Sequence, residues 1–289
     1  MNVVAVQLRE RIAKSEVADE TIRPLPDCRT AFQQIAKSCI EAVRTNKAQA
    51  ASGDAEAVHA MRIELTRLRA AGLFFSATTN DAAWLRIDRE LRWLNSILGK
   101  ARNRDVAIEY AKRKRYRDWA GTSQRVLVRS RDKAHRRLAK KLASARYGNL
   151  ISELSHWISE RPLHHDEQAL RSDRIDNYCD KRLRQWRDEI ASQGRHIRAL
   201  RRKRLHQLRI QSKNYRYMVD ALLNLDISIP REDFSFCETA KRVHQTLGDL
   251  RDLRQLRKAV GRRPPRYRKR KRKLIKRIEN SFRRLPLAG

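Results

Sequence analysis

Apolar residues recur every three or four positions along most of this chain, which is the period of amphipathic helices. The first stripe contains Phe32, Ile35, Cys39 and Val43 and ends near residues 51–54. Further helices are predicted over 54–76, after 78–81, and over 122–144, 147–159, 172–199, 200–224, 232–260 and from Pro264-Pro265 to 284. No stretch alternates with the period of two that strands require, so an all-α fold is predicted.

Two of these helices have apolar faces that are typical of helical bundles. The helix after residues 78–81 carries residues at heptad-like spacing: Trp84, Ile87, Leu91, Leu94 and Leu98. The last helix has an apolar face of Leu274, Ile278, Phe282 and Leu285, and its opposite face is densely cationic. Antiparallel helices that bury such faces against one another are therefore expected.

One segment of the chain occurs twice. Val58-His59-Ala60-Met61-Arg62-Ile63 through Arg69 is matched, without a gap, by Leu205-His206-Gln207-Leu208-Arg209-Ile210 through Arg216. Each copy is followed by a second match, Leu98-Gly99 with Arg104-Asp105 and then Leu247-Gly248 with Arg251-Asp252. Internal repeats indicate a duplicated unit. We therefore predict an N-terminal arm (1–28), a first helical bundle (29–162) and a second bundle (163–289), joined into one bilobed unit.

The basic residues of the repeated segment share one stripe of their helix. At about 100° per residue, with His59 at zero, Arg62 falls at about 300° and Arg69 at about 280°. Apolar residues lie beside this stripe at about 180–260°, namely Val58, Met61, Leu65 and Leu68. The second copy places His206, Arg209, Lys213 and Arg216 on the same stripe. Because these cations border a buried face, they are expected to line a groove or pore.

The charge of the chain points to a polyanionic partner. It has 67 Lys+Arg against 33 Asp+Glu, which gives a formal net charge of +34. Self-repulsion on this scale opposes a compact fold unless a polyanion neutralises it. The excess by itself fits nucleic acid, an anionic membrane or another phosphate polymer. A hydrophobic content of 40%, with only 9 Gly and 7 Pro, indicates a folded helical chain and not a disordered basic tail.

Several other functions are disfavoured by the sequence. Without an apolar run long enough for a membrane span or a signal peptide, a cytoplasmic protein is expected. The cysteines lack CxxC spacing and are expected in the core or at its boundary: Cys28, Cys39, Cys179 and Cys237. The loop His164-His165-Asp166-Glu167 lacks helical spacing, and no metal site is expected there. Walker-type, Gly-x-Ser-x-Gly and HExxH motifs are missing, so neither a cofactor nor an enzymatic activity is predicted.

The repeated residues resemble those of the CHAD family, the conserved histidine α-helical domains, over most of the chain. The resemblance is carried by His59-x-x-Arg62-Ile63 with Arg67-Leu68-Arg69, His206-x-x-Arg209-Ile210 with Lys213, Tyr215, Arg216 and Tyr217, and the two Leu-Gly landmarks with Asp105 and Asp252. It implies pseudo-twofold-related bundles with a basic central channel that binds inorganic polyphosphate. Thr66 departs from the family pattern, since the second copy has Lys213 there, and a weaker grip on phosphate is expected in the first half.

We expect the following residues to bind polyphosphate: His59, Arg62, Arg67, Arg69, Arg202, Lys203, His206, Arg209, Lys213, Arg216 and Arg270. Arginine offers a planar fork for phosphate oxygens, whereas lysine acts as a point charge. The two histidines would be driven toward imidazolium by a polyanion, with a neutral donor or a structural role as the alternatives. Asp105 and Asp252 are expected to hold arginines in position, because a carboxylate aimed at phosphate would repel it.

Two other readings of the sequence remain open. The first is a basic helical protein that binds nucleic acid, which the charge supports although no groove-reading or base-stacking element is recognised. The second is a phosphohydrolase or phosphotransferase that uses His59 or His206. Inositol polyphosphates are a further ligand class of the same chemistry. If polyphosphate is the ligand, targeting to polyphosphate granules is one purpose that such binding could serve.

Overall fold

The computed structural model of the chain describes residues 25–160 and 174–283, and every regular element in these ranges is a helix. The all-α prediction is confirmed. The first half contains α2 (Cys28–Thr45), α3 (Lys47–Ser52), α4 (Ala55–Phe74), α5 (Ser76–Thr79), α6 (Ala82–Lys112), α7 (Lys114–Ala120), a 3-10 turn (Gly121–Ser123), α8 (Gln124–Leu142) and α9 (Ala145–Glu160). The second contains α11 (Ile175–Arg195), α12 (Arg202–Leu223), α13 (Arg231–Val260) and α14 (Tyr267–Arg283).

Aspartates fix where three helices of the first half begin. The side chains of Asp27, Asp54 and Asp81 each accept a hydrogen bond from the backbone N–H three residues later, at 2.7, 2.6 and 2.6 Å. Such caps satisfy N–H groups that have no partner inside the helix. The first predicted stripe is divided in two at Asn46, and α3 ends at Gly53, whose φ of 98° is the left-handed conformation that glycine adopts at low cost.

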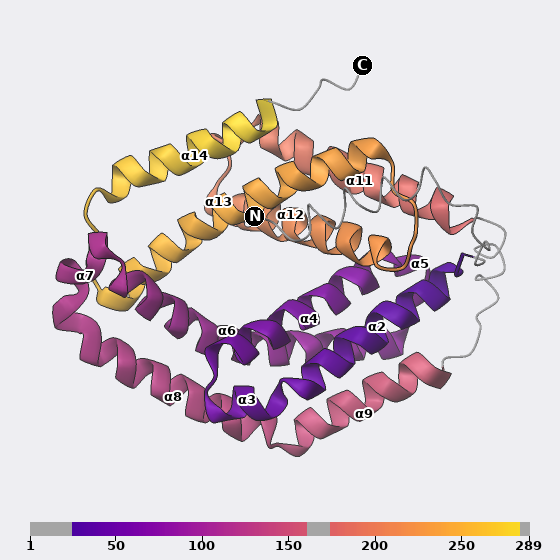
Figure 1. Cartoon of the computed structure of the whole chain (residues 1–289), viewed down its shortest axis with the longest axis horizontal. Coiled ribbons are helices and arrows are strands. Elements are labelled where there is room, and N and C mark those ends of the chain that lie inside the picture. The colour runs from indigo at the N-terminus through magenta and orange to yellow at the C-terminus, as the bar shows by residue number, and fades with distance from the viewer. Residues whose placement is uncertain (1–24, 161–173, 284–289) are drawn as a thin grey trace, which may run out of the picture.

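The two halves lie on either side of a gap between their ribbons (Figure 1). They meet where α4 packs against α12 and where α6 packs against α13. Between α6 and α13 the Tyr110 hydroxyl donates to Asp249 at 2.8 Å, and between α11 and the end of α4 the Tyr178 hydroxyl donates to the carbonyl of Phe74 at 2.6 Å. The basic segments therefore lie on helices that join the halves. The pseudo-twofold relation and the domain boundaries stay predictions.

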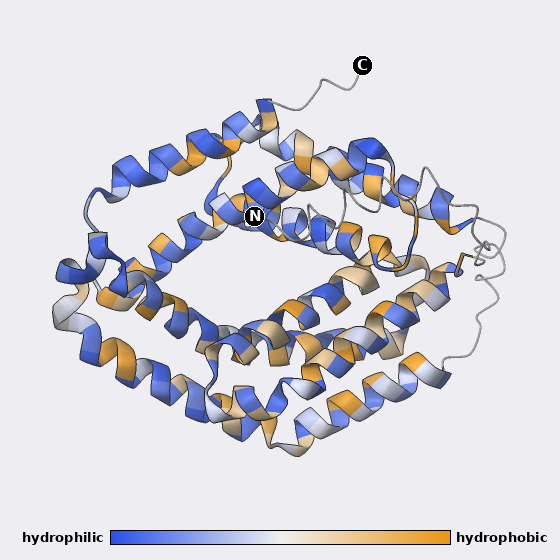
Figure 2. Cartoon of the chain, in the orientation of Figure 1, coloured by the Kyte–Doolittle hydropathy of each residue, from blue (hydrophilic) through white to orange (hydrophobic). Residues whose placement is uncertain are grey.

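One apolar core extends through both halves, from Cys28 on α2 to Phe282 on α14. The predicted seam of α6 and all four cysteines are buried, and none of the four cysteines, which all lie in the described ranges, forms a disulfide. Most residues of α8 and α14 are hydrophilic, and the few apolar positions of these helices pack inward (Figure 2). Among the described helices, none is long and apolar enough to cross a membrane.

The mostly cationic run at 112–117 includes the start of helix α7, which the sequence pattern does not predict. In α7, Tyr116 is only 1% exposed and packs in a second, smaller core with Tyr110, Leu253 and Leu256. The helix α6 also continues well beyond its heptad-like seam, as far as Lys112. The end of α6, α7 and the end of α13 thereby close one side of the molecule (Figure 1). Of the predicted arm at 1–28, residues 1–24 fall outside the described ranges, and Cys28 is already the first residue of α2. The segment 164–167 and Leu285 also fall outside these ranges.

Candidate functional site

Arg62 of α4 lies half-buried at the junction of the halves. Its Nε donates to Asn95 Oδ1 of α6 at 3.5 Å. Burial, followed by the charges of Arg251, Arg209 and Arg102, lowers the pKa of this guanidinium to about 10. Burial and like charges both disfavour the charged form. The fold therefore holds this cation where its charge is costly.

Arg209 of α12, the repeat equivalent of Arg62, is placed in the same way. Its Nε is buried without a hydrogen-bond partner. Burial, followed by the charge of Arg251, lowers its pKa to about 10, and Asp252 opposes this shift. Arg251 of α13 in turn donates to the side-chain oxygen of Asn103 on α6, which links the halves beside the cluster.

The glycines of the second repeated landmark lie beside these arginines. A Cβ on Gly99 would stand 3.6 Å from the guanidinium carbon of Arg62, and one on Gly248 would stand 3.9 Å from Arg209 Nε. An arginine side chain thus lies against each of these two glycines. Both distances are ordinary van der Waals contacts, so alanine would fit at either position without displacing the arginine.

Counted from the glycines, Arg102 matches Arg251, because each stands three residues further on. Each also lowers the pKa of the stripe arginine of its own half. In the repeated landmark, Arg104-Asp105 is matched with Arg251-Asp252, although the two dipeptides stand at different distances from Gly99 and Gly248. Arg102 and Arg251 therefore join the site as cations that were missed.

Lys213 of α12 is half-buried among the same cations. Burial, followed by the charges of Arg209 and Arg62, lowers the pKa of its amine to about 7. Arg251 contributes in the same direction, and so does Arg69. At neutral pH the amine is therefore divided between its neutral and ammonium forms. We call Arg62, Arg102, Arg209, Lys213 and Arg251 the central cluster.

Thr66 stands at the position equivalent to Lys213, and its hydroxyl is already engaged. It donates to the backbone carbonyl of Arg62 at 2.8 Å, and the residue is only 8% exposed. A side chain that bonds within its own helix has no free donor in this geometry. At this position the first half therefore has neither a cation nor a free hydroxyl donor.

The buried ring of Tyr217 lies beneath three cations. Arg67, Lys213 and Arg216 approach its centroid at 5.9, 5.8 and 4.9 Å. Because the face of an aromatic ring is electronegative, it holds cations without presenting a carboxylate to the ligand. Burial raises the pKa of the Tyr217 hydroxyl, which keeps the residue neutral.

The two repeated histidines lie at the edge of the cluster. The pKa of His59 is lowered by burial and then by Arg102, and that of His206 by burial and then by Arg209. Both histidines are therefore neutral at pH 7 in the free protein. A bound polyanion would oppose these shifts, since it favours the imidazolium form.

His244 of α13 is a residue that sequence reasoning missed. Neither ring nitrogen has a hydrogen-bond partner, and both are buried. Burial, followed by Arg209 and Arg216, lowers its pKa to about 2, so the ring is neutral. It stands four residues before Gly248, as Asn95 stands four before Gly99. This shared spacing from the glycine is the sequence signal that could have identified His244 as a site residue.

Carboxylates of the fold engage other arginines of the predicted set. Arg69 pairs with Asp88 of α6 at 2.6 Å, and Arg67 pairs with Glu64 at 2.9 Å. Arg216 lies 3.9 Å from Asp220 on its own helix. These three arginines are held by acids, whereas Arg62 and Arg209 have no ion pair within 4.0 Å among the described residues.

The two predicted orienting carboxylates differ in what they hold. Asp252 lies close to Arg251 and Arg209, and burial raises its own pKa. Asp105 bonds to Arg131 at 3.0 Å and to His135 at 2.9 Å, both on α8. Asp105 thus holds an arginine, but one that joins α6 to α8 and lies outside the central cluster.

A pocket of about 450 Å³ opens beside the cluster between α12 and α13. Its lining comprises the cations Arg202, Lys203, Arg209, Arg251 and Arg254 together with His206. Arg202 and Lys203 are therefore brought together with the stripe. Arg270 of α14 is not, because its guanidinium lies 5.9 Å from the ring centroid of Tyr116 on α7.

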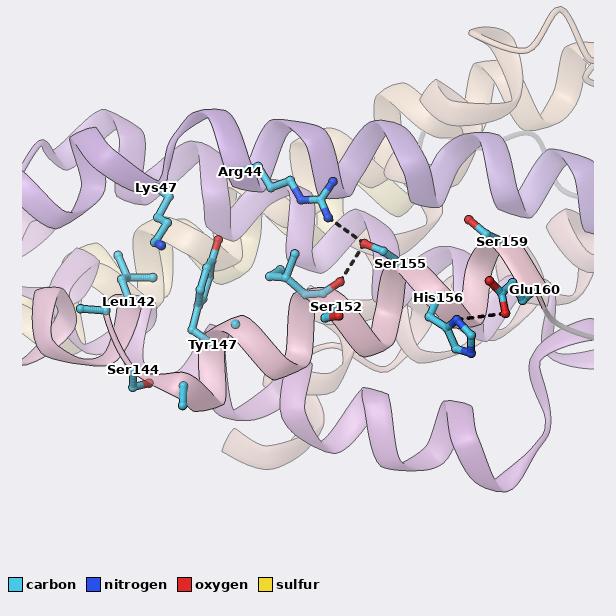
Figure 3. Close-up of a pocket in the computed structure, with 14 residues that line it drawn as sticks. Arg44, Lys47, Leu142, Ser144, Tyr147, Ser152, Ser155, His156, Ser159 and Glu160 are labelled. Atoms are coloured by element: carbon cyan, nitrogen blue, oxygen red, sulfur yellow. Dashed lines mark hydrogen bonds and ion pairs between the residues drawn. The ribbon is translucent and has the colours of Figure 1, made fainter.

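A second pocket, of about 800 Å³, lies between α2, α3 and α9 (Figure 3). Arg44 donates to the Ser155 hydroxyl at 2.9 Å, Lys47 lies 4.9 Å from the Tyr147 ring, and His156 pairs with Glu160 at 3.1 Å. Its cations have partners of their own, and none belongs to the repeated stripe. In the part of the chain that the structure describes, no group of three or more His, Cys, Asp or Glu is placed to hold a metal ion.

The comparisons with known proteins agree with this fold. The CHAD domain model matches residues 34–261, so the chain belongs to the CHAD domain family. The crystal structure of the CHAD domain from the plant Ricinus communis superposes with a TM-score of 0.71 at 19% identity, over 93% of this chain and 96% of that one. PptA from Streptomyces chartreusis superposes with a TM-score of 0.61 at 15% identity, over 89% and 98%. A search of curated protein sequences found no significant match.

Proposed function

We propose that this protein binds inorganic polyphosphate through the central cluster and that it does so without catalysis. The observation that carries the proposal is the half-burial of Arg62, Arg209 and Lys213 in one cluster without an ion pair of their own among the described residues, where burial and neighbouring arginines lower their pKa values. Cations that are half-buried beside one another raise the free energy of the free protein. A polyanion lying among them would offset that cost.

A polymer suits this site better than a single phosphate. The cations come from α4, α6, α12 and α13, and they continue into the pocket lined by Arg202 and Lys203. A linear chain with one charge per phosphate can contact all of them in succession. Displacement of the condensed counterions then supplies part of the binding free energy, as it does for nucleic acids. Inositol polyphosphates could occupy the cluster but would leave part of this track empty.

Nucleic acid is the rival ligand, and the exposed basic residues of α8 and α14 favour it. Binding of single strands relies on aromatic side chains that stack on bases. The rings of the described residues are largely spent on packing: Phe32, Trp84 and Trp157 pack edge-on or tilted in the core. Phosphate contacts without base contacts favour a ligand that consists of phosphates alone.

The absence of catalysis is part of the proposal. The acids around the cluster are engaged, with Asp88 on Arg69 and Asp252 beside Arg251 and Arg209. His244 is too weak a base to accept a proton at neutral pH. Incubation of the protein with polyphosphate, with and without magnesium, should release no orthophosphate above a protein-free control. Steady release that depends on His59 or His206 would show an enzyme instead.

A competition titration tests the ligand. Labelled long-chain polyphosphate is bound at physiological salt and displaced with unlabelled polyphosphate, single-stranded DNA, RNA, duplex DNA, an inositol polyphosphate or orthophosphate. Polyphosphate should compete best per phosphate, and orthophosphate should barely compete. Stronger displacement by a nucleic acid would overturn the proposal. Co-sedimentation with polyphosphate granules would then test whether binding targets the protein there.

A further inference from the structure

Lys213 is an amine surrounded by guanidinium groups. Arg209 lies one helical turn before it on α12, and the guanidinium groups of Arg67 and Arg216 lie over the same Tyr217 ring as the amine, 5.9 and 4.9 Å from its centroid. The charges of Arg62, Arg69 and Arg251 also act on the amine. Its neighbours include two neutral imidazoles, His206 and His244, which sense its charge. Its ring contact is with Tyr217. Among the described residues no carboxylate forms an ion pair with this amine within 4.0 Å, so the ammonium form is stabilised there only by the face of the Tyr217 ring.

We propose that Lys213 is a site of covalent acylation by acyl phosphates, small mixed anhydrides whose phosphate docks on the guanidinium groups around the amine. The inference rests on the proposed function because both use the same cations. It adds a second class of ligand, one that reacts with the protein.

Two properties that a reactive lysine needs coincide at this position. The amine must be neutral to act as a nucleophile, and burial among cations lowers its pKa to about 7. The reagent must also be held beside it, and planar guanidinium forks bind phosphate oxygens in pairs. Lysines on an outer helix face, such as Lys140 and Lys141 of α8, are exposed and lie outside the cluster.

The reaction balances without another reagent. The neutral nitrogen of Lys213 attacks the carbonyl carbon of the acyl phosphate, a C–N bond forms, and the C–O bond to phosphate breaks. The phosphate leaves with the electron pair of that bond, and the proton lost from nitrogen passes to the phosphate or to water. No oxidation or reduction occurs. Guanidinium groups that hold the phosphate also stabilise the charge that develops on it.

Acylation would change the site that it modifies. The product is an uncharged amide, which removes one cation from the cluster and lengthens its side chain. Polyphosphate affinity should therefore fall after acylation, and bound polyphosphate should shield the amine. The cluster would then respond to the supply of activated acyl groups as well as to polyphosphate.

The test uses acetyl phosphate as the probe on the full chain at about pH 8, with the acetylation rate at each lysine followed by quantitative mass spectrometry. Lys213 should react at least tenfold faster than Lys140 and Lys141, and polyphosphate should slow the reaction at Lys213 but not at Lys140 or Lys141. The N-hydroxysuccinimide ester of acetic acid, which has no phosphate, should show clearly less preference for Lys213.

Two results would overturn the inference: a rate at Lys213 no higher than at Lys140 and Lys141, or an equal preference for Lys213 with both reagents. Selective acetylation that polyphosphate does not slow would leave the inference standing and count against the proposed function. Polyphosphate binding without selective acetylation would overturn the inference and leave the proposed function standing. The two proposals therefore fail separately.

Discussion

Arg209 of α12 lowers the pKa of Arg62 of α4, although the two residues belong to different halves of the chain. They occupy the same position of the repeated segment, and the contact between α4 and α12 brings both into one cluster. Repulsion between them opposes the association of the halves. The apolar core and bonds such as that from Tyr110 to Asp249 must outweigh it. Cations kept in this position at a cost are characteristic of binding sites.

Neutralising one of these arginines should stabilise the free protein while weakening binding. The substitution Arg209→Gln removes the unfavourable free energy of a buried charge, which lowers the pKa of Arg209 to about 10. Each pKa unit corresponds to about 1.4 kcal/mol. We expect a gain of about 1–3 kcal/mol, at about 2–4 °C in Tm per kcal/mol. Thermal unfolding and polyphosphate titration measure the two effects. Arg137→Gln, an exposed cation of α8, is the control and should change neither strongly. A lower Tm for Arg209→Gln would show a structural arginine.

Reversing both charges should abolish binding without unfolding the protein. Arg62→Glu combined with Arg209→Glu puts two anions into the cluster, and the buried seam of α6 stays intact. The carboxylates would lie among Arg102, Arg251 and Lys213, which should hold them as ion pairs. Circular dichroism should remain helical while polyphosphate binding is lost. Loss of helix together with binding would return these arginines to a structural role.

Binding should weaken steeply as salt rises. If about eight phosphates are neutralised and single-stranded nucleic acid is a fair guide, at about −0.7 per contact, the log–log slope of affinity against salt is about −5 to −6. Titrations at four or five salt concentrations measure it. A slope of about −1 would mean that a single local site is occupied, and the extended track into the pocket of Arg202 and Lys203 would be wrong.

The fold could be predicted because its signals are local and periodic. The stripe of α2, the seam of α6 and the apolar face of α14 follow helical spacing, and the capping aspartates mark where helices begin. The helix α7 was missed because its cationic run hides a Tyr116 that is buried only through contacts with α6 and α13.

The site was predicted only in part, because packing between helices brings the missed residues to it. The stripe on α4 and α12 repeats in the sequence, so Arg62, Arg209 and Lys213 could be named. Arg251 lies in a repeated dipeptide and His244 four residues before Gly248, but only the packing of α13 shows that both face the stripe. The pairing of Arg69 with Asp88 joins two helices and has no local signal.

Binding should take up a proton above pH 7. The pKa of Lys213 is about 7 in the free protein, and a bound polyanion stabilises the ammonium form and raises that value. At about pH 8, binding should therefore take up as much as about one proton, and affinity should fall as pH rises from 7 to 9. Calorimetry in two buffers of different ionisation enthalpy measures the uptake. Lys213→Met should abolish it, and unchanged uptake in that variant would assign the proton to another group.

The stability of the free protein should also depend on the protonation of Lys213, but it should rise with pH, whereas the affinity falls. An unfolded lysine titrates at 10.5, above the value of about 7 in the folded protein. Between these values the unfolded chain binds more protons than the folded chain, so the free energy of unfolding rises with pH. Denaturant titrations at pH 7 and pH 9 should show this rise in the natural sequence and a smaller one in Lys213→Met. An equal rise in both would mean that Lys213 is not the buried amine responsible.

The two halves should contribute unequally to binding, and positions 66 and 213 provide the test. Lys213 offers an amine that becomes charged on binding, whereas the Thr66 hydroxyl donates to its own helix. A hydrogen bond to a charged group contributes about 1.5–3 kcal/mol, so Lys213→Thr should weaken binding about tenfold or more. Lys47→Thr removes a cation that lies over Tyr147 in the other pocket, and it should leave affinity nearly unchanged.

The converse change, Thr66→Lys, should tighten binding by a smaller factor. The substitution removes the hydrogen bond of the buried hydroxyl and places a longer side chain at a position that is only 8% exposed, so part of the gain is offset by lost stability. Titrations with polyphosphate of one defined length compare all three variants, and thermal unfolding separates lost affinity from lost fold. If Lys213→Thr and Thr66→Lys both leave affinity unchanged in folded protein, positions 66 and 213 do not face the ligand, and the polyanion must follow another path across the cluster.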